Sequence, residues 1–227
     1  MNVALLHAFP FDERMWEPQH DALSGHDVIA PRLYLLGRSM DEWARRVAER
    51  LNGEPVVAVG ASMGGYCALR LLAHADVRGL VLAGSRVDAD PPERRQAREE
   101  TIRIALEEGV EALWEAQRPR LFPEDAEPEV VQRARALALE QDPEELATGV
   151  AAMRDRPDST ELVQETEAPV LVGRGEHDSF LSAEEAEAAA GSARSGRAHT
   201  FPRCGHLPSM ERPDDFNRLL LDFLRGV

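Results

Sequence analysis

The segment Gly60-Ala61-Ser62-Met63-Gly64 places a serine between glycines, after an apolar run and before an apolar helical pattern. A G-x-S-x-G sequence at a strand-to-helix turn is typical of a nucleophilic serine, because the sharp turn projects the hydroxyl and the glycines leave it room. The alternatives are a glycine-rich turn without chemistry and a phosphate-binding loop. The chain has neither a G-x-G-x-x-G pattern nor any lysine, which disfavours the phosphate-binding loop. We therefore predict that Ser62 is a nucleophile.

A serine hydroxyl is a weak nucleophile unless a base removes its proton and an acid orients that base. His206 lies in the loop "RCGHLPSMERP", between the last predicted strand and the last predicted helix. Asp178 lies in "GRGEHDSFLS", directly after another predicted strand. Loops at the carboxyl ends of parallel strands carry the active sites of open sheets, so we predict a Ser62–His206–Asp178 triad. Three other carboxylates are alternatives to Asp178: Glu176, Asp88 and Asp90.

Short apolar strands alternate with amphipathic helices along the chain, which predicts an α/β fold with a parallel sheet. The continuous apolar character of the strands indicates that helices cover both faces of this sheet. We expect strands at 3–8, 27–31, 55–60, 79–84, 169–173 and 197–201. We expect helices at 40–52 and 183–190, each preceded by a capping-box pattern, and another after Pro213.

The alternation breaks between residues 88 and 158, which are charged, rich in proline and helical in pattern, without a strand signal. We therefore predict one core domain built from residues 1–87 and 159–227, with a helical insertion at 88–158. The acidic run "PEDAEPE" within this stretch is interpreted as a solvated surface.

The composition excludes several classes of function. All 26 basic residues are arginine, so Schiff-base and pyridoxal phosphate chemistry through lysine is excluded. The net charge of −15 argues against nucleic acid or an anionic membrane as a partner. No apolar run is long enough to cross a bilayer, and the start of the chain reads as a strand and not as a signal peptide. With only two cysteines as well, we expect a cytoplasmic protein.

Four stretches, "LLHAFPFDERMW", "GASMGGYCALR", "GRGEHD" and "GHLPSMERP", together resemble the α/β-hydrolase superfamily, in particular its cofactor-free esterases and enol-lactonase-like members. The resemblance implies an α/β-hydrolase fold, with a sheet of about six parallel strands flanked by helices and a variable cap at 88–158. It also implies an oxyanion hole formed by the backbone N–H groups of Phe9, in the loop His7-Ala8-Phe9-Pro10, and of Met63. His7 itself is expected to hold that loop.

The sequence departs from the family pattern in two loops. Ala8 replaces the usual glycine of the oxyanion loop. In "APRLYLLGRS", residues 30–39, Arg32 and Leu35 stand where the family commonly has aspartate and glycine. These departures affect the expected shape of the pocket wall and leave the triad residues in place.

The residues and the resemblance together predict a serine hydrolase that cleaves a small carboxylic ester through an acyl-enzyme, a carboxylesterase. This chemistry requires neither a cofactor nor a metal, and the remaining histidines show no metal-ligand spacing. The expected partner is a small-molecule ester, while the acyl and alcohol groups and the oligomeric state follow from no pattern. The alternatives are an enol-lactonase or lactonase, a thioesterase, a C–C hydrolase, or a non-catalytic hydrolase-fold receptor for a small molecule.

Overall fold

The computed structural model describes all 227 residues and contains one sheet of six parallel strands in the order β2-β1-β3-β4-β5-β6. The predicted six-stranded parallel sheet is therefore confirmed. The observed strands begin and end within a few residues of the predicted ranges. They are β1 (Asn2–Leu6), β2 (Asp27–Ile29), β3 (Val56–Ala61), β4 (Val77–Ala83), β5 (Val170–Gly175) and β6 (Gly196–Phe201).

The chain also contains ten α-helices, two 3-10 helices and one π-helical segment. The α-helices are α1 (Met40–Leu51), α2 (Met63–Leu71), α3 (Pro92–Arg103), α4 (Gly109–Leu121), α5 (Pro128–Leu139), α6 (Pro143–Arg154), α7 (Thr160–Glu165), α8 (Ala183–Ser192), α9 (Pro208–Glu211) and α10 (Pro213–Leu224). The 3-10 helices are η1 (Glu13–Gln19) and η2 (Leu33–Leu36), and the π-helical segment is η3 (Ile104–Glu108).

The two expected capping boxes differ in the structure. At α8, the Ser182 side chain accepts the N–H of Glu185, and the Glu185 carboxylate accepts the N–H of Ser182. At α1, Ser39 accepts the N–H of Glu42, but the Glu42 carboxylate binds the N–H of Arg38 instead. The capping box is thus complete only at α8.

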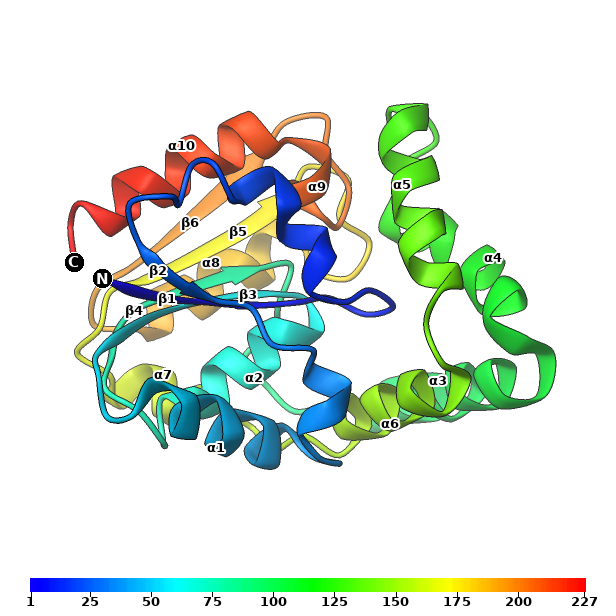
Figure 1. The fold of residues 1–227 in the computed structure, drawn as a ribbon, viewed down its shortest axis with the longest axis horizontal. Coiled ribbons are helices and arrows are strands. Elements are labelled where there is room, and N and C mark those ends of the chain that lie inside the picture. Colours follow the sequence, from blue (N-terminus) through cyan, green and yellow to red (C-terminus); the bar gives the residue numbers. More distant parts are fainter.

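Successive side chains of the central strands point into two hydrophobic cores, one on each face of the sheet. In β3, Val56 and Ala58 pack on the face covered by α1, α2 and α8, whereas Val57 and Val59 pack on the face covered by α10 and η1. Figure 1 shows this three-layer arrangement edge-on. Both faces of the parallel strands are buried, which explains why their sequences are apolar without alternation.

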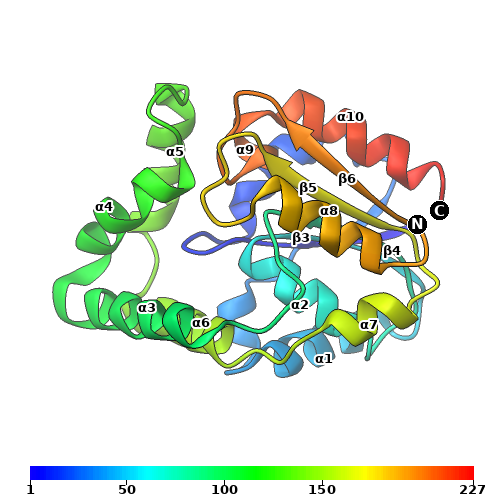
Figure 2. The ribbon, with the colours of Figure 1, turned by 180° about the vertical axis from the view of Figure 1, so that it is seen from behind.

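The chain between β4 and β5 is entirely helical. Helices α3 to α6 extend beyond the carboxyl ends of the strands, and α7 returns the chain beside the lower helical layer (Figures 1 and 2). Side chains of this helical stretch join both hydrophobic cores. Trp114 and Leu121 of α4 and Ala134 of α5 pack in the core of the α10 face, whereas Leu113 of α4 and Ala105 of η3 pack in the core of the opposite face. We call residues 92–154 the insertion; the division of the chain into domains at 87 and 159 stays a prediction.

A cavity of about 990 Å³ lies at the amino ends of the strands. Its lining includes Asn2, Val56, Val77 and Pro169, at or beside the first residues of β1, β3, β4 and β5. It therefore opens at the end of the sheet opposite to Ser62, which follows β3. None of the helices has the length and apolar character needed to cross a membrane.

Candidate active site

Ser62 occupies the sharp turn between β3 and α2 with a positive φ of 48° and a ψ of −111°. A serine side chain is strained in this region of backbone conformation, so the surrounding structure must hold it there. The N–H of Ser62 donates to the carbonyl of Ala83 at the end of β4, at 2.7 Å. Its own carbonyl accepts from Gly65 N–H at 3.0 Å and from the Ser85 hydroxyl at 2.9 Å.

The glycines around Ser62 are required because neighbouring backbone and side chains approach them closely. A Cβ atom on Gly64 would lie 2.0 Å from the carbonyl oxygen of Leu6, and one on Gly65 would lie 2.0 Å from the hydroxyl oxygen of Ser85. A Cβ on Gly60 would lie 2.4 Å from Gly65 Cα. The turn therefore packs directly against β1 and β4, which fixes the position of the serine.

The structure brings Ser62, His206 and Asp178 together in one hydrogen-bonded chain. His206 Nε2 lies 2.8 Å from Ser62 Oγ, and His206 Nδ1 lies 2.8 Å from Asp178 Oδ1. The side chain of His206 is 2% exposed and that of Asp178 is fully buried, whereas Ser62 is partly exposed. Of these three hydrogen-bonded residues, Ser62 is therefore the one that is accessible to solvent.

The three alternative carboxylates lie elsewhere in hydrogen bonds of their own. Glu176 accepts the backbone N–H of Arg203 at 2.9 Å. Asp88 pairs with Arg86 at 2.5 Å, and Asp90 pairs with arginines of the insertion and its flank. None of the three is hydrogen-bonded to the imidazole of His206.

Asp178 is held as a carboxylate by its surroundings. Burial raises the pKa of Asp178, but the neighbouring His206 and the backbone N–H groups of Phe180 and Leu181 lower it more, so the pKa lies below its ordinary value. An ionised Asp178 fixes a proton on His206 Nδ1, which leaves Nε2 free to accept the proton of Ser62. The Phe180 ring lies 4.4 Å from the imidazole, between centroids, and covers it.

The backbone on both sides of His206 is bound by Glu211, the last residue of α9. The Glu211 carboxylate accepts the N–H groups of Gly205 at 2.8 Å and Leu207 at 2.9 Å. Burial raises the pKa of Glu211, and these two N–H groups oppose that effect. The N–H of His206 donates to the carbonyl of Leu121 at the end of α4, at 2.9 Å. The histidine loop is therefore fixed by α9 and by the insertion.

The two backbone groups expected to bind an oxyanion have no acceptor within the protein. Neither Phe9 N–H nor Met63 N–H forms a hydrogen bond to another group of the chain. His7 holds the first of these loops, as expected. Its Nδ1 lies 3.2 Å from the carbonyl of Ala8, and its Nε2 accepts the N–H of Leu33 at 2.8 Å. Complete burial lowers the pKa of His7 to about 4, so the ring is neutral at pH 7.

Loop 30–39, where the sequence departs from the family pattern, forms the short helix η2 against the insertion. Arg32 reaches Glu145 of α6 at 2.8 Å and Gln141 at 3.2 Å. Leu35 is 65% exposed, and Tyr34 is buried against α6, where a Cβ on Gly149 would lie 2.6 Å from its ring. Of the two departures, only Arg32 connects this loop to the insertion, by its ion pair with Glu145, while the aromatic contact is made by the neighbouring Tyr34.

The structure gives no sign of a metal site, because no three histidine, cysteine or acidic side chains converge as ligands. Cys67 and Cys204 are both buried and unpaired with each other. Burial raises the pKa of both thiols, which keeps them protonated and unreactive at neutral pH.

Comparison with known proteins agrees with this fold. The sequence model described as "Alpha/beta hydrolase family" matches residues 3–219. The chain therefore belongs to the α/β hydrolase family.

Three relatives illustrate the range of this family. A thermophilic esterase from Thermogutta terrifontis, solved with malate bound, is 32% identical, with a TM-score of 0.92 over 100% of this chain and 90% of its own. The enol-lactonase from Burkholderia xenovorans LB400 is 26% identical, with a TM-score of 0.88 over 99% of this chain and 91% of its own. A 2-hydroxy-6-oxo-6-phenylhexa-2,4-dienoate hydrolase from Burkholderia cepacia is 27% identical over 73% of this chain. The chain spans only 61% of the length of this last relative.

Sequence reasoning missed several residues around the hydrogen-bonded chain. Phe180, which packs on the imidazole, and Glu211, which binds the histidine loop, both lie within stretches that were already singled out. Their spacing from Asp178 and His206 was the available signal, since each lies within five residues of its neighbour. Of the arginines that meet Asp90, Arg94 lies four residues away in the sequence, whereas Arg98 and Arg156 had no such local signal.

Proposed function

We propose that this protein is a serine hydrolase of small carboxylic esters. The observation that carries the proposal is the hydrogen-bonded chain in which 2.8 Å separates Ser62 Oγ from His206 Nε2 and 2.8 Å separates His206 Nδ1 from Asp178 Oδ1. Such a chain is the requirement for activating a serine hydroxyl, and the strained elbow keeps that hydroxyl exposed. A purely structural turn would need neither the histidine nor the buried carboxylate.

The reaction begins when Ser62 Oγ attacks the ester carbonyl carbon and its proton passes to His206 Nε2. The imidazolium that forms is stabilised by the Asp178 carboxylate. The carbonyl oxygen becomes negative in the tetrahedral intermediate, and the unpaired N–H groups of Phe9 and Met63 are the donors that we assign to it. Each donor of this kind lowers the barrier by about 3–4 kcal/mol.

His206 then returns its proton to the departing alcohol oxygen as the carbon–oxygen bond of the ester breaks. A water molecule, deprotonated by the same Nε2, attacks the acyl carbon and releases the acid from Ser62. Every proton in both half-reactions passes through Nε2. In this proposal, residues 88–158 act as the cap that shapes the substrate pocket above Ser62.

The test is turnover of a panel of acyl esters and lactones by wild type and Ser62→Ala, with fluorophosphonate labelling of both. We expect wild type to label at Ser62 and to hydrolyse short esters. We expect Ser62→Ala to lose the label and to lose kcat by about 10⁴- to 10⁶-fold, since triad members act as a unit. An unlabelled wild type without turnover of any substrate would favour the receptor alternative.

A second candidate, hydrolysis of a carbon–carbon bond, is favoured by the curated relatives, which are C–C hydrolases of the same superfamily. The enol-lactonase likeness favours cyclic esters in the same way. Including a vinylogous 1,5-diketone and an enol-lactone in the panel separates these activities, because the three substrate types release different products.

A further inference from the structure

Four arginines gather where the insertion meets the sheet, close to the proposed catalytic residues. Arg94 and Arg98 lie on α3, Arg120 lies at the end of α4, and Arg156 follows α6. Three of them surround one carboxylate, that of Asp90, whose side chain is fully buried. Arg156 Nη1 lies 2.7 Å and Arg98 Nε 3.1 Å from its oxygens, and Arg94 Nε lies 3.9 Å away.

Arg156 is fully engaged by the protein. Besides Asp90, it donates to the carbonyls of Met153 and Asp88, each at 2.9 Å, and its side chain is only 3% exposed. It therefore serves as a structural partner of Asp90. Arg156 already neutralises the charge of Asp90. The positive charges of Arg98 and Arg94 are therefore in excess.

Arg98 and Arg120 retain donors without an acceptor in the chain. Arg98 uses only Nε toward Asp90, which leaves its two terminal nitrogens unpaired, and its side chain is 15% exposed. Arg120 has no carboxylate partner at all, and its guanidinium carbon lies 4.2 Å above the centre of the Phe180 ring. Loss of hydration, followed by the like charges of Arg98 and Arg94, lowers the pKa of Arg120.

Two aromatic rings connect the arginines to the proposed catalytic residues. Phe180 packs under Arg120 and against His206, whose ring centroid lies 4.4 Å from its own. Tyr66 packs under Arg156 at 3.9 Å and lies one helical turn after Ser62 on α2. The free guanidinium of Arg120 is thus separated from the base by a single aromatic ring, that of Phe180.

An excess of positive charge in partly desolvated surroundings is costly unless an anion offsets it. In a chain of net charge −15, acidic side chains are abundant, yet none approaches Arg120. A guanidinium group with free donors matches the geometry of a carboxylate. We infer that the substrate carries a carboxylate besides the scissile ester, and that Arg98 and Arg120 bind it; this inference rests on the proposed ester hydrolysis.

The test compares two esters that differ only in this charge, monoethyl succinate and its neutral amide analogue ethyl succinamate, by the release of ethanol. We expect wild type to prefer the anionic ester by at least about 10-fold in kcat/KM. Arg98→Gln and Arg120→Gln should each lower kcat/KM for monoethyl succinate by about 10- to 100-fold, chiefly through KM, and change the neutral ester less than about 3-fold. Arg120→Gln removes no ion pair, only the contact of the guanidinium with the Phe180 ring.

Arg103→Gln is the matched control, because it removes an arginine from the other end of α3. It should leave both kcat/KM values unchanged. A wild type that hydrolyses both esters equally, or variants that lose both activities in parallel, would overturn the inference while leaving the proposed function intact.

A binding measurement tests the carboxylate site independently of ester hydrolysis. Succinate should raise the melting temperature of Ser62→Ala, and it should raise that of the Ser62→Ala/Arg120→Gln double variant much less. If wild type hydrolyses no ester but this shift is observed, ester hydrolysis fails and the carboxylate site stands. If succinate shifts neither protein, the carboxylate site is wrong.

Discussion

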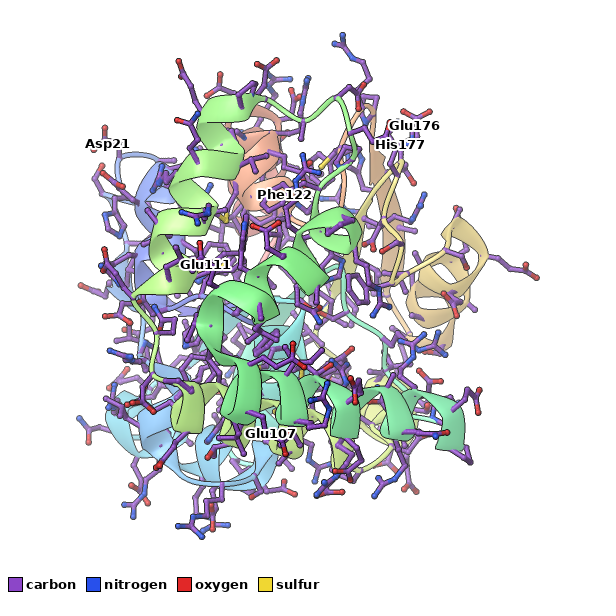
Figure 3. The ribbon with its side chains drawn as sticks, turned by 90° about the vertical axis from the view of Figure 1, so that its right-hand side faces the viewer. Asp21, Glu107, Glu111, Phe122, Glu176 and His177 are labelled. Carbon is purple, nitrogen blue, oxygen red and sulfur yellow. The ribbon has the colours of Figure 1, made fainter.

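The two ends of helix α3 pair arginine and carboxylate in opposite proportions. At the carboxyl end, the single guanidinium of Arg103 meets Glu100 at 2.7 Å, Glu107 at 3.2 Å and Glu108 at 2.6 Å. Glu107 lies on the exposed side of the insertion (Figure 3). At the amino end, the buried carboxylate of Asp90 meets three guanidinium groups.

The two ends of α3 differ in how strongly water and salt screen their charges. Exposed ion pairs gain little, because water and salt screen them and long side chains lose freedom when they pair. Buried charges are not screened, so an imbalance there persists until a ligand or a structural change removes it. The excess of acid around Arg103 is therefore of small consequence, whereas the excess of arginine around the buried Asp90 persists in the folded protein.

The largest effect should come from removing Asp90. Asp90→Asn leaves Arg156 buried without a counter-charge, and such a change typically costs about 3–5 kcal/mol in the free energy of unfolding. Urea unfolding monitored by circular dichroism measures it, with Glu100→Gln at the exposed end of the same helix as the control. An unchanged urea midpoint for Asp90→Asn would remove the contrast between the two ends.

A buried titratable group should also make stability depend on pH where an exposed one does not. The unfolded chain protonates His7 near its ordinary pKa of 6.5, while the folded chain does so only near about 4. The unfolded state therefore binds more protons between these values, and stability falls as the pH drops from about 6.5 towards 4, by about 3 kcal/mol in total.

Urea unfolding of wild type and His7→Gln at several pH values in this window isolates the contribution of His7. The variant should be less stable at pH 7 but should lose less stability on acidification. His20→Gln, which removes an exposed histidine, should follow wild type. Parallel pH curves for wild type and His7→Gln would contradict the buried neutral ring.

The smallest effect should come from the exposed end of α3. Arg103→Gln should leave the urea midpoint within experimental scatter of wild type. Any difference should vanish at about 1 M salt, where the screening length is about 3 Å. A large loss of stability that persists in high salt would mean that this network is as important as the one around Asp90.

The sheet and the elbow could be predicted because their signals are local. A run of apolar residues, a glycine pattern and a histidine in a loop are each contained in one short stretch of sequence. A local signal of this kind could not decide between Asp178, Asp88 and Asp90. All three lie in loops that follow parallel strands, and such loops meet at one edge of the sheet. The packing of that edge decides which acid forms a hydrogen bond with the imidazole of His206, and that acid is Asp178.

The arginine cluster could not be predicted, because its members come from separate helices and the loop after α6. The sequence "PPERRQAREE" at the start of α3 is typical of a solvated surface, and no residue of that helix is buried. Asp90 becomes buried only when Arg156, far along the chain, folds back against it. Such a pairing depends on the path of the insertion, which no local pattern specifies.

The hydrogen bond from His206 N–H to the carbonyl of Leu121 joins the base to the last turn of α4. The same turn contains Arg120 and leads into the buried ring of Phe122 (Figure 3). A displacement of α4 therefore moves the histidine loop with it or breaks this bond. Helix α4 and the loop that contains His206 are thus coupled by this hydrogen bond, so a substitution that shifts α4 also tests the alignment of His206.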